Sequence, residues 1–231
     1  MKMKKILAVL LMAATVFTFA ACGEKADVKG EGVMTYAEYE AAELESEVVV
    51  ETYVQAKQSW WQDKATLYTQ DKDGAYFIYE LPCSEEEYAK LVPGTKIKVT
   101  GYKAEWSGEV EIVDAKYEIL NGSYIAKAED LTELLGNEEE LIKHQNKLVS
   151  FKGLTVEKVE YKNEEPGDDI YVTLSRDGKP YSFCVEVYLT GTETEVYKTV
   201  GELKAGDIVD VECFLYWYNG ANPHITSVKV K

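Results

Sequence analysis

The sequence is poor in arginine, histidine, cysteine and proline. Among 231 residues there is one arginine, Arg176, and 41 Asp+Glu outnumber 25 Lys+Arg, for a formal net charge of -16. Binding to a nucleic-acid backbone depends on lysine and arginine side chains that neutralise phosphates. The charge balance therefore predicts that nucleic acid is not a partner of this chain.

The scarcity of histidine limits the catalytic chemistry. His144 and His224 are the two histidines, and neither accompanies a serine or cysteine nucleophile motif, an HExxH motif or a glycine-rich phosphate loop. We therefore predict no enzyme, no catalytic residue and no cofactor. Residues 163–169 concentrate oxygen ligands that suit calcium, but they lack the alternating spacing of an EF-hand. A solvated turn is the favoured interpretation, and no metal site is predicted.

A long apolar run occurs only at the N-terminus. Lysines at positions 2, 4 and 5 precede an uncharged apolar run over residues 6–21, which is 16 residues long. A membrane-spanning helix needs about 20 residues, so residues 1–21 are predicted to be an export signal peptide. No apolar stretch of spanning length follows.

The end of this run resembles the lipobox of bacterial lipoproteins. Its sequence is Phe19-Ala20-Ala21-Cys22-Gly23, in which phenylalanine replaces the usual leucine. The resemblance implies that Cys22 is lipidated and becomes the mature N-terminus, and two acyl chains suffice for stable anchoring. Ordinary cleavage or an uncleaved anchor is the alternative. We expect a lipid-anchored chain on the extracytoplasmic face of the cell membrane, with residues 22–32 as a tether.

The remaining cysteines carry no recognisable motif. Cys83, Cys184 and Cys213 are odd in number and show neither a CxxC pair nor metal-ligand spacing. A disulfide between Cys184 and Cys213 is one alternative. Buried free thiols are the favoured interpretation.

An internal repeat organises the rest of the chain. Residues 91–99 align with residues 203–211 at a constant offset of 112, which pairs Gly94 with Gly206. The same offset brings Trp106-Ser107-Gly108 onto Tyr218-Asn219-Gly220. The two copies predict a first domain at residues 33–122 and a second at residues 123–231, joined near residues 122–128 without a long linker.

Each copy predicts the same series of short elements. Capping boxes begin at Thr35 and Ser84, and Thr192 caps a helix in the second copy. Further helices are expected near residues 129–135 and 138–145. Alternating and valine-rich segments predict strands at residues 47–56, 65–70, 75–81, 96–102 and 110–116, and at 148–160, 170–175, 181–188, 208–217 and 224–230.

Five strands with a helix between the third and fourth is the order of an OB-fold, a Greek-key barrel. The predicted fold class is mainly β with short helices, arranged as two consecutive five-stranded OB-fold barrels. With the lipobox, the repeated turns at Gly94 and Gly206 and the hairpin glycines Gly74 and Gly178, the chain resembles the tandem OB-fold lipoproteins of bacterial cell surfaces. That resemblance implies a fold and a location, and no catalytic residue.

Aromatic residues gather in the segments that border an OB binding face. The candidate ligand-binding residues are Trp60, Trp61, Trp106, Tyr161, Tyr216, Trp217 and Tyr218. Indole and phenol rings at loop tips stack on sugars or grip peptides. Packing that closes the barrels or joins the domains is the alternative.

The sequence thus predicts a non-enzymatic binding module for an oligosaccharide or peptide. A structural or assembly component of the cell envelope, which acts through protein contacts, is the alternative function. Its acidic surfaces would complement a basic protein partner.

Overall fold

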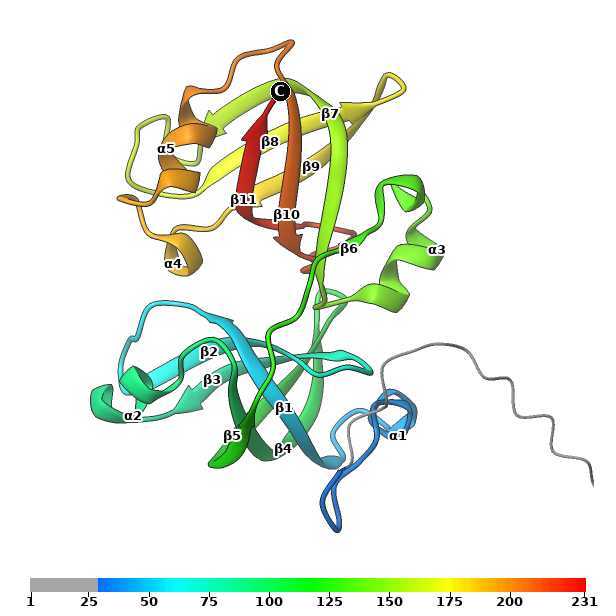
Figure 1. The fold of residues 1–231 in the computed structure, drawn as a ribbon, viewed down its shortest axis with the longest axis vertical. Helices are drawn as coiled ribbons and strands as arrows, with labels where there is room; N and C mark the ends of the chain where they lie inside the picture. Colours follow the sequence, from blue (N-terminus) through cyan, green and yellow to red (C-terminus); the bar gives the residue numbers. More distant parts are fainter. Residues whose placement is uncertain (1–28) are drawn as a thin grey trace, which may run out of the picture.

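The computed structural model describes residues 29–231. The predicted signal peptide and Cys22 lie outside these residues. Two β-rich halves are stacked along the long axis, the first below and the second above in Figure 1. Within residues 29–231, no helix combines the length and apolar character needed to cross a membrane.

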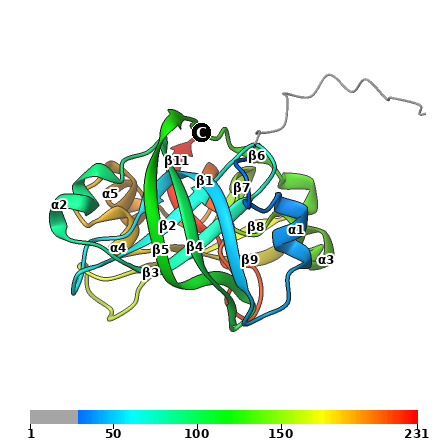
Figure 2. The ribbon, with the colours of Figure 1, turned by 90° about the horizontal axis from the view of Figure 1, so that it is seen from below.

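The first half is a closed five-stranded barrel. Its strands are joined in the order β1-β2-β3-β5-β4, and β1 pairs with β4 to close the ring. Figure 2 views this barrel from below, with α1 and α2 on opposite sides. The predicted OB-like barrel is therefore confirmed for this half. Its elements are α1 (Tyr36–Ala41), β1 (Glu47–Lys57), β2 (Lys64–Gln70), β3 (Ala75–Pro82), α2 (Glu85–Lys90), β4 (Thr95–Trp106) and β5 (Glu109–Ser123).

The second half is a six-stranded sheet in the order β10-β11-β9-β8-β7-β6, in which β10 also pairs with β7. The prediction of a second closed barrel is not confirmed, because β9 and β11 share a single residue pair, Cys184 with His224. The elements are β6 (Glu129–Asp130), η1 (Thr132–Leu134), α3 (Glu138–Leu141), η2 (Ile142–His144), β7 (Leu148–Tyr161), β8 (Ile170–Arg176), β9 (Lys179–Val185), α4 (Val187–Thr190), α5 (Glu195–Glu202), β10 (Ile208–Phe214) and β11 (His224–Val230).

The aligned glycines have the same structural role in both halves. Gly94 and Gly206 adopt positive φ values of 91° and 96°, a conformation that glycine enters without steric cost. Their N–H groups donate to the carbonyls of Val54 on β1 (2.7 Å) and Val156 on β7 (2.8 Å). The turn before β4 is therefore tied to β1, and the turn before β10 is tied to β7.

Local capping signals predicted some helix starts and missed others. The boxes at Thr35 and Ser84 are formed as predicted. The cap predicted at Thr192 is wrong, because Thr194 accepts the hydrogen bond from the Tyr197 N–H and begins α5. The helix predicted near residues 129–135 is instead β6 followed by η1, where strand pairing with β7 prevails over propensity.

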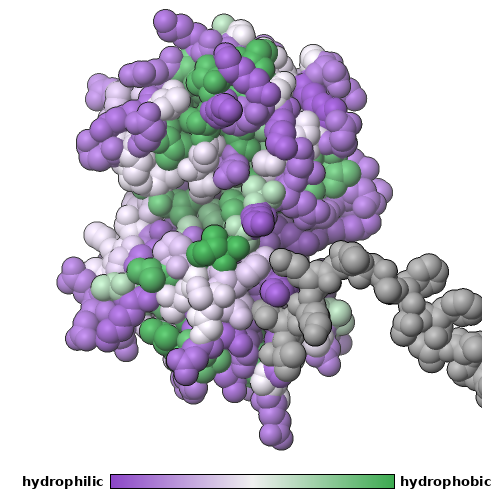
Figure 3. Space-filling model, in the orientation of Figure 1, coloured by the Kyte–Doolittle hydropathy of each residue, from purple (hydrophilic) through white to green (hydrophobic). Residues whose placement is uncertain are grey.

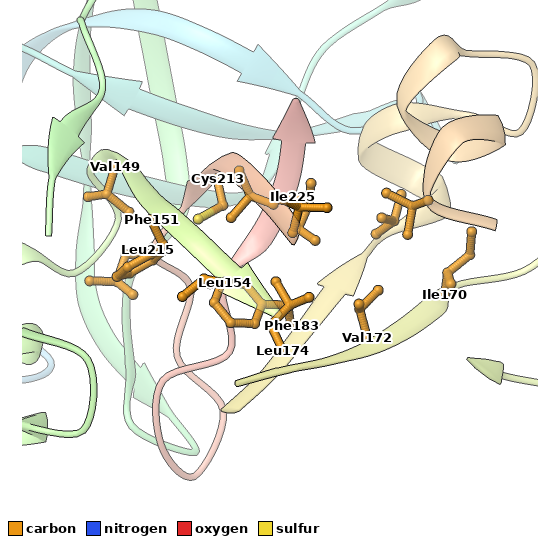
Figure 4. Packing of buried hydrophobic residues seen from close by; sticks show 14 of the residues in the cluster. Val149, Phe151, Leu154, Ile170, Val172, Leu174, Phe183, Cys213, Leu215 and Ile225 are labelled. Atoms are coloured by element: carbon orange, nitrogen blue, oxygen red, sulfur yellow. The ribbon is translucent and has the colours of Figure 1, made fainter. Parts of the chain in front are cut away.

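Each half has its own apolar core. Figure 4 shows the core of the second half, where Phe151 and Phe183 meet edge to face with ring centroids 5.6 Å apart. A third, smaller cluster of Tyr68, Phe77 and Phe214 lies between the halves. The halves are therefore joined through buried rings as well as through the chain.

A second connection, which we call the junction, joins the β4–β5 turn to the segment after β10. The Asn219 N–H donates to the Ser107 carbonyl (2.7 Å), and the Trp217 N–H donates to the Glu109 carboxyl (2.8 Å). Gly108 has a φ of +90°, and a Cβ built on it would lie 2.7 Å from the Trp217 ring. Trp217 thus packs where a side chain at residue 108 would stand.

The Gly108→Ala substitution tests this packing. We expect it to lower the free energy of unfolding, because alanine adds both backbone strain, on the order of 1–3 kcal/mol, and a clash with Trp217. Gly178→Ala is the matched control, since its φ is +73° and its Cβ would meet open space. Urea denaturation measures both variants. Equal losses of stability would show that Trp217 is not held tightly against Gly108.

Candidate functional site: an aromatic cleft between the halves

The two halves enclose a cleft of about 560 Å³, which we call the inter-half cleft. Pale and green side chains gather along the boundary between the halves on the face shown in Figure 3. The volume suits a small molecule. Its aromatic lining residues are Trp61, Phe77, Tyr79, Trp106, Tyr171, Tyr188, Tyr216 and Tyr218.

Buried rings from both halves pack together beneath the cleft, and Tyr216 and His224 of this group line it. The Tyr68 ring stacks on Phe214 with centroids 4.5 Å apart, and its hydroxyl shares a 2.8 Å hydrogen bond with Nδ1 of His224. The His224 ring stacks in turn on Tyr216, also at 4.5 Å. Burial raises the pKa of Tyr68 far above its usual range, so its hydroxyl keeps its proton. Stacked aromatic rings therefore support the cleft from below.

The rim carries aromatic rings that remain accessible to solvent. Trp106 and Tyr218 have their centroids 5.2 Å apart and stand directly beside the junction. Trp61 is 71% exposed and Tyr188 is 60% exposed, on the loop after β1 and on α4. The Ser59 N–H donates to the Tyr188 carbonyl (2.7 Å), which holds these two segments together.

The charged groups of the cleft are mostly acidic. Glu80, Asp169 and Glu186 line it, and Lys64 is the one lysine or arginine of its lining. The Lys64 ammonium is paired with Glu80 at 2.6 Å. Both carboxyl oxygens of Glu186 accept hydrogen bonds from the Gln58 amide at 2.9 Å, and one of them also lies 3.5 Å from Nδ1 of His224.

The structure brings together four of the seven sequence-predicted ligand residues. Trp61, Trp106, Tyr216 and Tyr218 all line the inter-half cleft. The other three are engaged elsewhere. Trp60 packs on the first core with its indole N–H donating to the Cys83 carbonyl, Trp217 is buried, and Tyr161 packs beside Tyr197 near α5.

Sequence reasoning missed Tyr79, Tyr171 and Tyr188. Tyr171 had a signal, because it alternates with the buried Ile170 and Val172 and so faces outward from β8. The sequence predicts a strand that includes Tyr188, whereas β9 ends at Val185 and Tyr188 lies on α4. Cys184 also lines the cleft, but burial raises the pKa of its thiol well above its usual range, so it remains protonated.

The remaining candidates have structural partners. Lys162, just before the 163–169 loop, pairs with Asp168 (3.4 Å) and with the buried Asp169 (3.0 Å). His144 lies 3.2 Å from Glu129. Within the part of the chain that the structure describes, no three His, Cys, Asp or Glu side chains are placed to hold a metal ion. Cys83, Cys184 and Cys213 are buried free thiols.

Glu109, at the junction, was not singled out from the sequence. Its side chain is fully buried, and its Oε1 and the Oδ1 of Asn146 are among the buried atoms without a hydrogen-bond partner. Burial raises the pKa of Glu109 well above its usual range, and the Asn146 amide and the Trp217 N–H oppose that shift only in part. A neutral Glu109 can donate to an acceptor that a charged one cannot.

This shift makes the stability of the fold depend on pH. An unfolded glutamate releases its proton near pH ~4.3, whereas the folded chain retains it, so the free energy of unfolding falls as pH rises above that value toward the folded pKa. Glu109→Gln keeps an acceptor for Trp217 and carries no charge. We expect this variant to lose less stability than the parent between pH 5 and 8, as measured by thermal melting.

Glu105→Gln, which removes an exposed carboxyl from the same β4–β5 hairpin, is the matched control. It should follow the pH dependence of the parent. A Glu109→Gln variant with the parent's pH profile would mean that Glu109 is already charged in the folded protein.

No protein-family model matches the chain, and no curated protein matches it. Solved structures do resemble it. A murine DNA-binding protein bound to double-stranded DNA covers 79% of this chain and 94% of its own, at 13% identity and a TM-score of 0.37. The Ifi202 HINa domain in complex with double-stranded DNA covers 80% and 98%, at 12% identity and 0.37. A replication protein A heterotrimer bound to single-stranded DNA covers 89% and 52%, at 12% identity and 0.35.

These neighbours correct two predictions from the sequence. The exclusion of nucleic acid is wrong as an inference from composition, because net charge is a sum over the whole surface and does not describe one groove. The prediction of a binding module for oligosaccharides or peptides, or alternatively of an envelope assembly component, is likewise corrected, since the similar solved structures are DNA complexes. At TM-scores below 0.5, the likeness transfers no ligand to this chain.

Proposed function

We propose that this chain is a binding protein for a small organic cation, which it holds in the inter-half cleft. One observation carries the proposal: solvent-exposed aromatic rings from both halves and three carboxylates line the same cleft. A cation over the face of an aromatic ring is attracted by the ring quadrupole, most strongly by tryptophan. Aromatic enclosures of this kind suit quaternary ammonium groups.

The electrostatics of the cleft favour a cation over an anion. Its single lysine is already paired with Glu80, so an incoming phosphate or carboxylate would meet Asp169 and Glu186 without a free positive partner. A cation near Glu186 would add a charge-assisted contact to the stacking energy of the rings. No catalytic residue is needed for this role, and we propose that the chain is not an enzyme.

Titration calorimetry with choline tests the proposal. Choline should bind, whereas dimethylbutanol, its uncharged carbon isostere, should bind far more weakly. Trp61→Ala and Trp106→Ala should each weaken choline binding by about 2- to 30-fold, the range of one cation–π contact. Because Trp61 is largely exposed, its truncation should leave the melting temperature close to that of the parent.

Tyr102→Ala is the control, since Tyr102 is an exposed aromatic residue of β4 that does not line the cleft. Equal binding of choline and its isostere would contradict the proposal, as would full binding by Trp61→Ala. A single-stranded oligothymidine that binds and displaces choline would make nucleic acid the ligand class.

We further propose a two-unit organisation, with residues 33–122 and 123–231 as OB-like units. In support, β7, β8, β9, β11 and β10 follow the same order as β1, β2, β3, β5 and β4, and β10 pairs back onto β7. A crystal structure without the β7–β10 pairing would contradict this assignment.

The location of the protein is a proposal from the sequence of residues 1–28. The lipobox-like segment supports a bacterial lipoprotein that is anchored through Cys22 on the extracytoplasmic face of the cell membrane. Detergent-extracted protein should then have the mass of a chain that begins at Cys22 and carries a diacylglyceryl group. The mass of the unprocessed, unmodified chain would contradict this location.

A further inference from the structure

We propose that the ligand is an elongated amphiphilic cation, whose charged head lies in the inter-half cleft and whose apolar tail lies in an adjoining hollow of the second half. This inference rests on the proposed function and names the chemical class of the ligand more closely. The observation behind it is a second hollow that shares a wall with the first.

The second hollow, which we call the tail hollow, has a volume of about 750 Å³. It lies between the η1–α3 segment on one side and the loop of residues 218–223 on the other, with residues 180–183 of β9 in its lining. Apolar side chains dominate that lining: Leu135, Leu141, Phe151, Phe183, Ala221 and Pro223. Such a surface favours a hydrocarbon or uncharged ring over a charged group.

The two hollows adjoin, because Tyr171, Tyr218 and Asn222 line both of them. Tyr171 is 45% exposed and Tyr218 is 49% exposed, so a ligand can lie across both rings from one hollow to the other. The loop that carries Tyr218 is closed by hydrogen bonds from the Tyr218 N–H to the Gly220 carbonyl (2.8 Å) and from the Asn222 N–H to the Tyr216 carbonyl (2.9 Å). These hydrogen bonds give the loop a defined shape where the two hollows adjoin.

The distribution of charge sets the direction of the ligand. The inter-half cleft is lined by three carboxylates and one lysine, whereas Glu138 is the one charged residue that lines the tail hollow. A cationic head is therefore attracted more strongly by the inter-half cleft. An uncharged tail can be buried in the tail hollow without the cost of removing a charge from water. The reverse orientation would place the charge beside leucine and phenylalanine.

Titration calorimetry with a series of alkyltrimethylammonium ions tests this inference, at concentrations below micelle formation. Tetramethylammonium measures the head alone, and the butyl and octyl members add the tail. We expect affinity to rise with chain length by up to about fourfold for each methylene group, the limit for full burial. Alkyl sulfates of the same length should bind far more weakly, because their heads are anionic.

Ser182→Trp fills the tail hollow from an exposed position of β9, where tryptophan is compatible with a strand. It should abolish the dependence on chain length and leave the affinity for tetramethylammonium unchanged. Ser227→Trp is the matched control: it makes the same substitution at an exposed position of β11 outside both hollows, and it should behave like the parent.

The outcomes separate this inference from the proposed function. Tetramethylammonium binding with no gain from longer chains would overturn the tail assignment and leave the cation site standing. A chain-length dependence that persists in Ser182→Trp, or equal binding of alkyl sulfates, would also overturn it. Binding by no member of the series would overturn both.

Discussion

The arrangement of the inter-half cleft depends on the junction between the β4–β5 turn and the segment after β10. Three groups in that turn accept hydrogen bonds from the second half: the Ser107 and Gly108 carbonyls and the Glu109 carboxyl, which bind Asn219, Gln145 and Trp217. These bonds lie next to Trp106 and Tyr218, whose rings face each other at 5.2 Å. Buried bonds of this kind resist solvent competition. The spacing of the aromatic rim is thus set by the backbone of both halves.

This junction includes a buried carboxyl group, and its protonation state affects the stability of the fold. Trp217 needs an acceptor for its N–H where the two halves meet, and Glu109 supplies one from the first half. Burial makes the charged form of Glu109 expensive, so its pKa rises well above its usual range. Protonation then favours the folded chain, in which this carboxyl is buried. The same residue therefore connects the two halves and makes their connection sensitive to pH.

Local features were predictable from the sequence, and features that depend on contact between the halves were not. The Ser84 capping box and the turns at Gly94 and Gly206 are encoded within a few residues, and the structure contains them. The burial of adjacent aromatic residues could not be predicted in this way. Trp60 is packed into a core while Trp61 is largely exposed, and the same contrast separates Trp217 from Tyr218. Whether each of these rings is buried depends on which strand or half packs against it, and the neighbouring sequence does not show that.

The effect of the chain's acidity on ligand binding depends on where its carboxylates lie in the folded structure. Summed over the sequence, this acidity predicts that nucleic acid is not a partner, but a net charge does not describe the potential of one groove. In the folded chain, much of the charge is neutralised locally, as when Lys162 pairs with Asp168 and Asp169. Glu186 is hydrogen-bonded to the neutral amide of Gln58 and lies 3.5 Å from Nδ1 of His224, within an enclosure of aromatic rings. A carboxylate held in this way beside the faces of π systems attracts a cation. The preference of the cleft for a cation therefore depends on where its carboxylates lie, and the total net charge has little influence on it.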